Sequence, residues 1–160
     1  MGYTHYWDIK KNETYDSNKM RDTFKKVSAE IKKGLNELPD KTSIKICGGN
    51  HGYPTPVINE SEVWFNGDPT GDMGHETFHI PIGDFYTGLW KGKFAFCKTA
   101  RKPYDLLVCF ALISFAQHFP PKVFTYSSDG DSGDWETAFN FYEKVTGKKI
   151  KKTNKKFINS

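Results

Sequence analysis

The chain has few cysteines and no long apolar run. Its three cysteines, Cys47, Cys97 and Cys109, are scattered without a C-x-x-C pair, so their spacing offers neither a zinc motif nor a dithiol redox motif. Reduced, buried thiols in a cytosolic protein are the plain interpretation. The longest apolar stretch, residues 106–115, is about half as long as a membrane-spanning helix, and the N-terminus has no signal-peptide pattern. We therefore expect a cytoplasmic protein with no membrane partner.

Fingerprints of cofactor binding and catalysis are also missing. The sequence contains no G-x-x-x-x-G-K-[ST] or G-x-G-x-x-G phosphate loop and no G-x-S-x-G nucleophile elbow. It therefore names no cofactor and does not decide whether the protein is an enzyme.

The composition is that of one folded domain with a basic end. With 160 residues, 37% hydrophobic and 16% aromatic, the chain is long enough for a single core. We expect a domain over residues 1–147 and a flexible lysine-rich tail over 148–160. Six lysines lie in this tail, and without them the formal charge of +4 becomes −2. The charge of residues 1–147 therefore gives little reason to expect a basic face that binds nucleic acid, although the tail could still contact phosphates.

Hydrophobic periodicity predicts an α+β domain, with a mostly antiparallel, mixed sheet packed by about three helices. Strands are expected at residues 3–9, 44–46, 63–65, 76–82, 93–99 and 123–127, and helices at 17–38, 103–118 and 134–147. The helix at 103–118 is apolar nearly all round, which predicts a central position. The Gly- and Pro-rich segment 48–59 is expected to be a loop.

Four residues are predicted to mark the ends of the helices. Asp16 is expected to cap the first helix, Pro103 to occupy the first turn of the second, and Asp134 to cap the third. Gly147 is expected to end that last helix.

Three strings of residues resemble an uncharacterised family of small proteins from bacteriophages and bacteria. They are Met-Gly-Tyr-Thr-His-Tyr-Trp at 1–7, Phe-Cys-Lys-Thr-Ala-Arg-Lys-Pro-Tyr-Asp at 96–105, and Ser-Ser-Asp-Gly at 127–130 followed by Asp134 and Trp135. The resemblance implies a phage or bacterial cytoplasmic origin and a single compact unit. It brings no activity with it.

A basic turn, Lys98, Arg101 and Lys102, lies between a predicted strand and a predicted helix. Unpaired backbone N–H groups and the helix dipole favour an anion at such a place, so these residues are predicted to bind a phosphate group. The alternative is that the cations pair with Asp105 or with the acidic loop at residues 127–134.

The acidic loop gathers three aspartates, Asp129, Asp131 and Asp134. Carboxylates this close could bind a divalent metal, for which Asp129 and Asp131 are the candidates, or raise one pKa for catalysis by Asp129. The calcium-loop pattern fails because Asp134 and Asn140 stand where Gly and Glu belong. Turn formation and helix capping are the alternative explanation.

The histidines suggest a minor alternative. His75-Glu76-Thr77 resembles one half of the paired H-x-T signature of two-histidine phosphoesterases, in which the histidines act as acid and base. The other half is represented only by His5-Tyr6-Trp7, which supplies a candidate catalytic histidine but no hydroxyl group.

Aromatic residues on the predicted strands could stack on bases, as they do in many single-strand binders. Trp7 is the candidate ligand-binding residue, in a set that also includes Tyr3, Tyr6, Trp64, Phe94 and Phe96. Such residues are more often core. Strand alternation is expected to bury one part of the set and to leave the other partly exposed.

Two functions therefore stay open. The first is a site for a phosphate-bearing ligand, a nucleotide or nucleic acid, at the basic turn, with His5, Asp129 or Asp131 as catalytic or metal groups. The second is a non-enzymatic interaction protein, such as a phage accessory factor that binds or sequesters a host protein. The first is favoured if the basic turn and the acidic loop face one concave pocket lined by exposed aromatic residues. The second is favoured if their charges pair with each other on a convex surface.

Overall fold

A computed structural model describes residues 2–10, 12, 14–49, 53–82 and 93–151. Within them the chain forms three α-helices and seven strands, and every strand pair is antiparallel. The predicted α+β class is confirmed. The predicted flexibility of residues 152–160 lies outside the described part of the chain.

The elements have the following bounds. The strands are β1 Thr4–Ile9, β2 Ile46–Cys47, β3 Val57–Ile58, β4 Glu62–Gly67, β5 Phe78–Pro81, β6 Lys93–Lys98 and β7 Phe124–Ser128. The helices are α1 Ser17–Asn36, α3 Asp105–His118 and α4 Glu136–Thr146, with a 3₁₀ turn at Pro69–Gly71.

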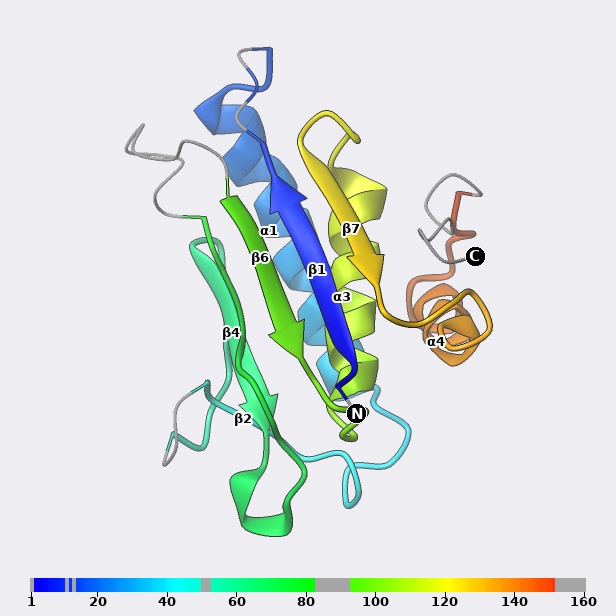
Figure 1. The fold of residues 1–160 in the computed structure, drawn as a ribbon. Helices are drawn as coiled ribbons and strands as arrows, with labels where there is room; N and C mark the ends of the chain where they lie inside the picture. The colour runs from blue at the N-terminus through cyan, green and yellow to red at the C-terminus, as the bar shows by residue number, and fades with distance from the viewer. Residues whose placement is uncertain (1, 11, 13, 50–52, 83–92, 152–160) are drawn as a thin grey trace.

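One sheet has the strand order β6-β1-β7, and the described helices α1 and α3 lie against one of its faces (Figure 1). Figure 1 shows its three strands in front, with α1 and α3 behind them. The side chains of β1 alternate between buried and half-buried positions along the whole strand, because successive residues of a strand point to opposite faces. Tyr3, His5, Trp7 and Ile9 are buried on the helix side, whereas Thr4, Tyr6 and Asp8 alternate with them on the open side.

The core is built around α3. Its residues 107–115 are all buried, as expected for a helix that is apolar on every side, so the predicted central position is confirmed. The amphipathic α1 packs on α3, and the two helices are close together at Gly34, where an added Cβ would lie 2.8 Å from the ring of Phe110. Helix α4 packs against α3, and the rings of Phe141 and Tyr142 lie 5.4 Å and 5.1 Å from the ring of Phe110.

The second sheet is organised around β4, which pairs with β2, β3 and β5. Strand β3 lies inside the segment that was predicted to be a loop, so that prediction is wrong in part. Two paired residues, Val57 with Trp64 and Ile58 with Val63, suffice for the pairing, and a strand this short has no periodicity to detect. The sheets meet where the Glu76 N–H donates to the Lys98 carbonyl at 3.2 Å.

The ends of the helices agree only in part with those predicted from the sequence. Asp16 accepts a hydrogen bond from the Lys19 N–H at 2.9 Å, and Gly147 ends α4 with a φ of 68°, as predicted. The prediction that Pro103 lies in the first turn of α3 and the prediction that Asp134 caps α4 are both wrong, because α3 begins at Asp105 and α4 at Glu136. In both cases a separate turn stands between the residue and the helix. No helix in the described ranges is long and apolar enough to cross a membrane.

Candidate functional site

Strand β6 ends in a strained turn. The Lys102 N–H donates to the Thr99 carbonyl at 3.0 Å, and the two central residues, Ala100 and Arg101, have φ values of 52° and 58°. Glycine or asparagine usually occupies such positions, and other residues lose roughly 1–2 kcal/mol each there. Hydrogen bonds from the Thr99 and Ala100 N–H groups to the Tyr3 carbonyl fix the turn against β1.

Two cations of the basic turn are already paired with carboxylates. The Arg101 guanidinium lies 3.9 Å above the centre of the Tyr3 ring and 3.3 Å from an Asp134 carboxylate oxygen. Nζ of Lys102 lies 2.8 Å from Asp72. For Arg101 the structure therefore shows the predicted alternative, a pair with the acidic loop. Lys98 lies at the end of β6, where its side chain runs beside Gly2.

The aspartates of the acidic loop hold the loop in shape. Asp129 accepts hydrogen bonds from the Thr4 N–H at 3.0 Å and from the Tyr6 hydroxyl at 3.1 Å. Asp131 and Asp134 each accept from the other's N–H group. The backbone bond from Asp131, together with the Arg101 guanidinium, lowers the pKa of Asp134. These contacts are those of a capped turn, and a metal at Asp129 and Asp131 stays a prediction.

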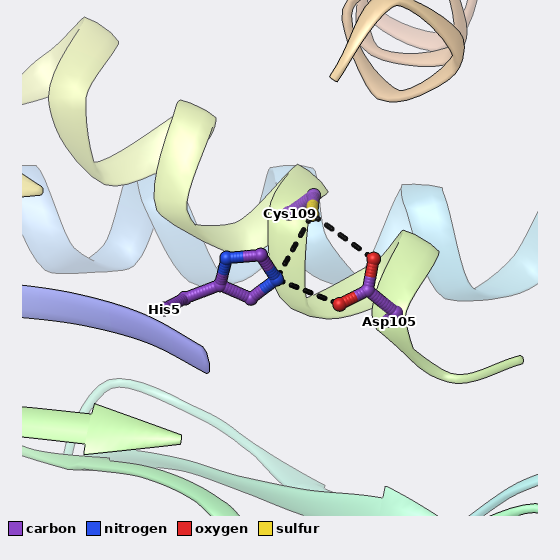
Figure 2. A group of neighbouring side chains, drawn as sticks. All are labelled: His5, Asp105 and Cys109. Carbon is purple, nitrogen blue, oxygen red and sulfur yellow. Dashed lines mark hydrogen bonds and ion pairs between the residues drawn. The ribbon is translucent and has the colours of Figure 1, made fainter. Parts of the chain in front are cut away.

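A buried polar cluster lies between β1 and α3, and it includes the candidate His5. Figure 2 shows His5 reaching from the strand to Asp105 and Cys109 on the helix. Nε2 of His5 is 2.6 Å from Oδ1 of Asp105 and 3.6 Å from Sγ of Cys109, and that sulfur is 3.5 Å from Oδ2 of Asp105. The other ring nitrogen, Nδ1, is 2.8 Å from the Ser128 hydroxyl. Thr99 donates to Asp105 at 2.5 Å.

Burial shapes the electrostatics of this cluster. His5 is fully buried, whereas the side chain of Asp105 is 22% exposed. Burial alone would raise the pKa of Asp105, but hydrogen bonds from His5, Thr99 and Cys109 outweigh it and lower the pKa. Burial, followed by the nearby Asp105 charge, raises the pKa of the Cys109 thiol well above its usual range. The cluster thus stabilises a carboxylate beside a protonated thiol.

The chain Ser128–His5–Asp105 has the connectivity of a hydrolytic triad, but a triad needs a nucleophile that substrate can reach. Ser128 is 4% exposed, and its hydroxyl oxygen also accepts the Gly130 N–H at 3.0 Å. The structure does not support hydrolysis by Ser128.

The open face of the β6-β1-β7 sheet carries three aromatic rings. Phe94 and Phe96 are 62% and 56% exposed, and the ring of Tyr6 stacks on Phe94 with 6.1 Å between centroids. Phe96 pairs directly with Tyr6 across the strands. A hollow of about 360 Å³ lies beside these rings, and its lining includes Asp8 and Thr125.

The predicted ligand-binding residue Trp7 lies on the other face of the same strand. Trp7 is 3% exposed, and the centroid of its ring lies 5.1 Å from that of Phe78. A ligand at the surface therefore cannot stack on this ring. Tyr3 is also buried. The sequence thus predicted an aromatic sheet, but the outward-facing rings on β1 and β6 are Tyr6, Phe94 and Phe96.

A second cavity, of about 270 Å³, lies beside the β2–β4 pair. Asn66, Asp72 and His75 line it together with several glycines. Each of these polar side chains already bonds within the protein: Asn66 with the backbone of His75, Asp72 with Lys102, and His75 with the carbonyl of Lys98. His75 is exposed and His5 is buried, which does not favour a two-histidine phosphoesterase.

Sequence reasoning missed Asp105 and Cys109 as partners of His5. Their spacing of four residues on a helix was the available signal, because it places two side chains on one face. The third partner comes from β1, which only the tertiary fold brings close. Comparison of the chain with protein-family models, curated proteins and solved structures found no match.

Proposed function

We propose that the protein binds the bases of single-stranded nucleic acid on the open face of the β6-β1-β7 sheet. The observation that carries the proposal is the exposure of Phe94 and Phe96, 62% and 56%, on a sheet whose other face holds the core. Large rings exposed together mark a binding surface. RNA-binding domains that use a helix-backed sheet also stack bases on aromatic rings of adjacent strands.

The spacing of the rings suits a strand of several bases. Phe94 and Phe96 are two residues apart on β6, hence about 7 Å apart on the same face. Each ring can stack on a separate base. Tyr6, on the neighbouring strand, lies opposite Phe96 and stacks on Phe94. A free nucleotide has the same base chemistry but would use only one of these surfaces.

Charge on this face is limited, which predicts how binding responds to salt. Lys98 ends the row begun by Phe94 and Phe96, and the carboxylate of Asp8 stands opposite Phe94. Since the charged residues Lys98 and Asp8, both in the described part of the chain, have opposite signs, we expect stacking to supply most of the affinity. The salt dependence should therefore be shallow, since its slope follows the number of phosphates neutralised.

Fluorescence anisotropy with labelled 12-mer DNA and RNA oligonucleotides tests the proposal. The full-length double variant Phe94→Ala/Phe96→Ala should bind at least tenfold more weakly, since stacking contributes roughly 1–3 kcal/mol per base. Tyr53→Ala is the matched control, because Tyr53 is 59% exposed but packs against Trp64 away from this face.

Three results of this experiment have different meanings. Binding that the double variant weakens and mononucleotides displace only at far higher concentration supports the proposal. Equally tight binding of mononucleotides points to a nucleotide site instead. Absence of binding contradicts the proposal. Steeply salt-dependent binding that the double variant leaves unchanged also contradicts base stacking, and it points to the lysine-rich tail as the source of the affinity.

The ion pairs of the basic turn favour a second candidate function. Arg101 pairs with Asp134 of the acidic loop, which is the arrangement expected for an interaction protein, and Lys102 pairs with Asp72 outside that loop. Under this proposal the aromatic face would contact a host protein. The resemblance to phage proteins supports this proposal, because a phage protein acts inside a host cell. Capture of one specific host protein by the wild type but not by the Phe94→Ala/Phe96→Ala variant, with no oligonucleotide binding, would support it.

A further inference from the structure

We infer that His5, Asp105 and Cys109 form a binding site for a transition metal ion, with zinc as the best match. The three residues offer one imidazole nitrogen, one carboxylate oxygen and one sulfur, all within 4.8 Å of one another. Cys109 would bind the metal as a thiolate, so its thiol proton is released to solvent when the metal enters. The site lies on the helix side of β1, so it is independent of the proposed base-binding face.

The distances to sulfur are those that zinc requires. A tetrahedral zinc ion has bonds of about 2.3 Å to sulfur and about 2.0–2.2 Å to nitrogen or oxygen, which separates sulfur from each of these atoms by about 3.5 Å. Sγ of Cys109 lies 3.6 Å from Nε2 of His5 and 3.5 Å from Oδ2 of Asp105. The contact of 2.6 Å between Nε2 of His5 and Oδ1 of Asp105 is too short for two ligands of one zinc ion, so it has to open by roughly 0.7 Å if Oδ1 binds the metal.

Two hydroxyl groups already orient the ligands from behind. Ser128 lies 2.8 Å from Nδ1 of His5, and Thr99 donates to Asp105 at 2.5 Å. If Nδ1–H donates to Ser128, Nε2 presents its lone pair to the metal, and the Ser128 hydroxyl can turn to the neighbouring Tyr3 hydroxyl. Such outer contacts fix the tautomer and the ring position in known metal sites.

The ligand set selects the kind of metal. A sulfur and an imidazole exclude magnesium and calcium, which prefer oxygen ligands alone, and they suit zinc. The spacing Asp-x-x-x-Cys places both helix ligands on one face of α3. Asp105, 22% exposed, is the ligand nearest to solvent. It therefore marks both the entry path and an open fourth position for water or a substrate atom.

Metal loading of the full-length protein tests the site. The protein is stripped with a chelator, dialysed against zinc and analysed by elemental mass spectrometry. We expect an equimolar amount of zinc in the wild type and at least a tenfold loss of affinity in Cys109→Ser and Asp105→Asn. Cys47→Ser should bind like the wild type, because Cys47 lies near Gly67 on the second sheet.

Cobalt provides a readout that depends on the ligand itself. The cobalt-loaded wild type should show the visible bands of a tetrahedral site and a sulfur-to-cobalt charge-transfer band. Cys109→Ser should lose the charge-transfer band, and Cys47→Ser should keep it. Should the variants fail to fold, X-ray absorption of the zinc-loaded wild type still decides. One sulfur with lighter ligands in the first shell supports the site. No zinc in the wild type, or a shell without sulfur, overturns it.

Discussion

Nε2 of His5 lies 2.6 Å from Oδ1 of Asp105, although the two residues are 100 positions apart in the chain. The contact joins the first strand to the first turn of the central helix, and the imidazole is fully buried. Any change to either partner leaves a buried polar group without its counterpart, which is costly in a protein interior.

The first prediction concerns this contact. In protein kept free of metal by a chelator, His5→Gln and Asp105→Asn should each lower the free energy of unfolding by about 3 kcal/mol. The double variant should lose less than the sum, with a coupling of about 1–3 kcal/mol by urea denaturation. His79 and Glu62 are 2.9 Å apart with side chains 43% and 39% exposed, and they form the control pair, with a coupling below about 1 kcal/mol. Equal coupling in both pairs would contradict the prediction.

The second prediction concerns pH and the carboxylate of Glu30, whose side chain is 12% exposed. This group contacts residues of α3, of α4 and of the segment after it: Ser114, His118, Tyr142 and Lys148. Burial alone would raise its pKa, but the close contact with His118 and the hydrogen bonds from Lys148, Tyr142 and Ser114 outweigh that effect and lower the pKa from 4.5 to about 2. A depressed pKa stabilises the fold above the unfolded value, and the contribution is lost as pH falls through the folded value.

Glu30→Gln should therefore destabilise the protein by up to about 3 kcal/mol at pH 6. The difference from wild type should shrink as pH falls from about 4.5 towards 2. Urea denaturation across this range measures it. Glu37→Gln, an exposed position just after the same helix, is the control and should change stability by less than about 0.5 kcal/mol. A Glu30→Gln deficit that stayed constant down to pH 2 would show that the carboxylate does not titrate in this way.

The third prediction sets helix propensity against packing. Alanine is favoured over glycine in a helix by about 1 kcal/mol, but a Cβ at Gly34 would meet the ring of Phe110 at 2.8 Å. Because the core around α3 is closely packed, we expect Gly34→Ala to destabilise by about 1–3 kcal/mol. Adding Phe110→Leu, which removes the clashing ring, should cost less in the Gly34→Ala background than in the wild type. Thermal unfolding of the four proteins tests this, and stabilisation by Gly34→Ala alone would refute it.

The sequence predicted elements best where a periodic pattern was long. The four-residue steps of α1, the wholly apolar α3 and the alternation of β1 each carried enough residues to define a period. Strand β3 was missed, and the starts of α3 and α4 were predicted too early, because two paired residues or one turn before a helix leave no such pattern. At Ala100 and Arg101, left-handed backbone occurs without glycine, so the usual turn residue was not there to be found.

The chain by itself determined the α+β class, the buried central helix and the presence of an aromatic sheet, since these follow from local periodicity and side-chain volume. Only the tertiary structure decided which aromatic residues face outwards, because strand alternation gives two faces but does not say which one the helices cover. Likewise, only the fold brought His5 to Asp105 and Cys109 and paired Arg101 with Asp134. Contacts between residues far apart in the chain depend on how the elements pack, and no local pattern encodes them.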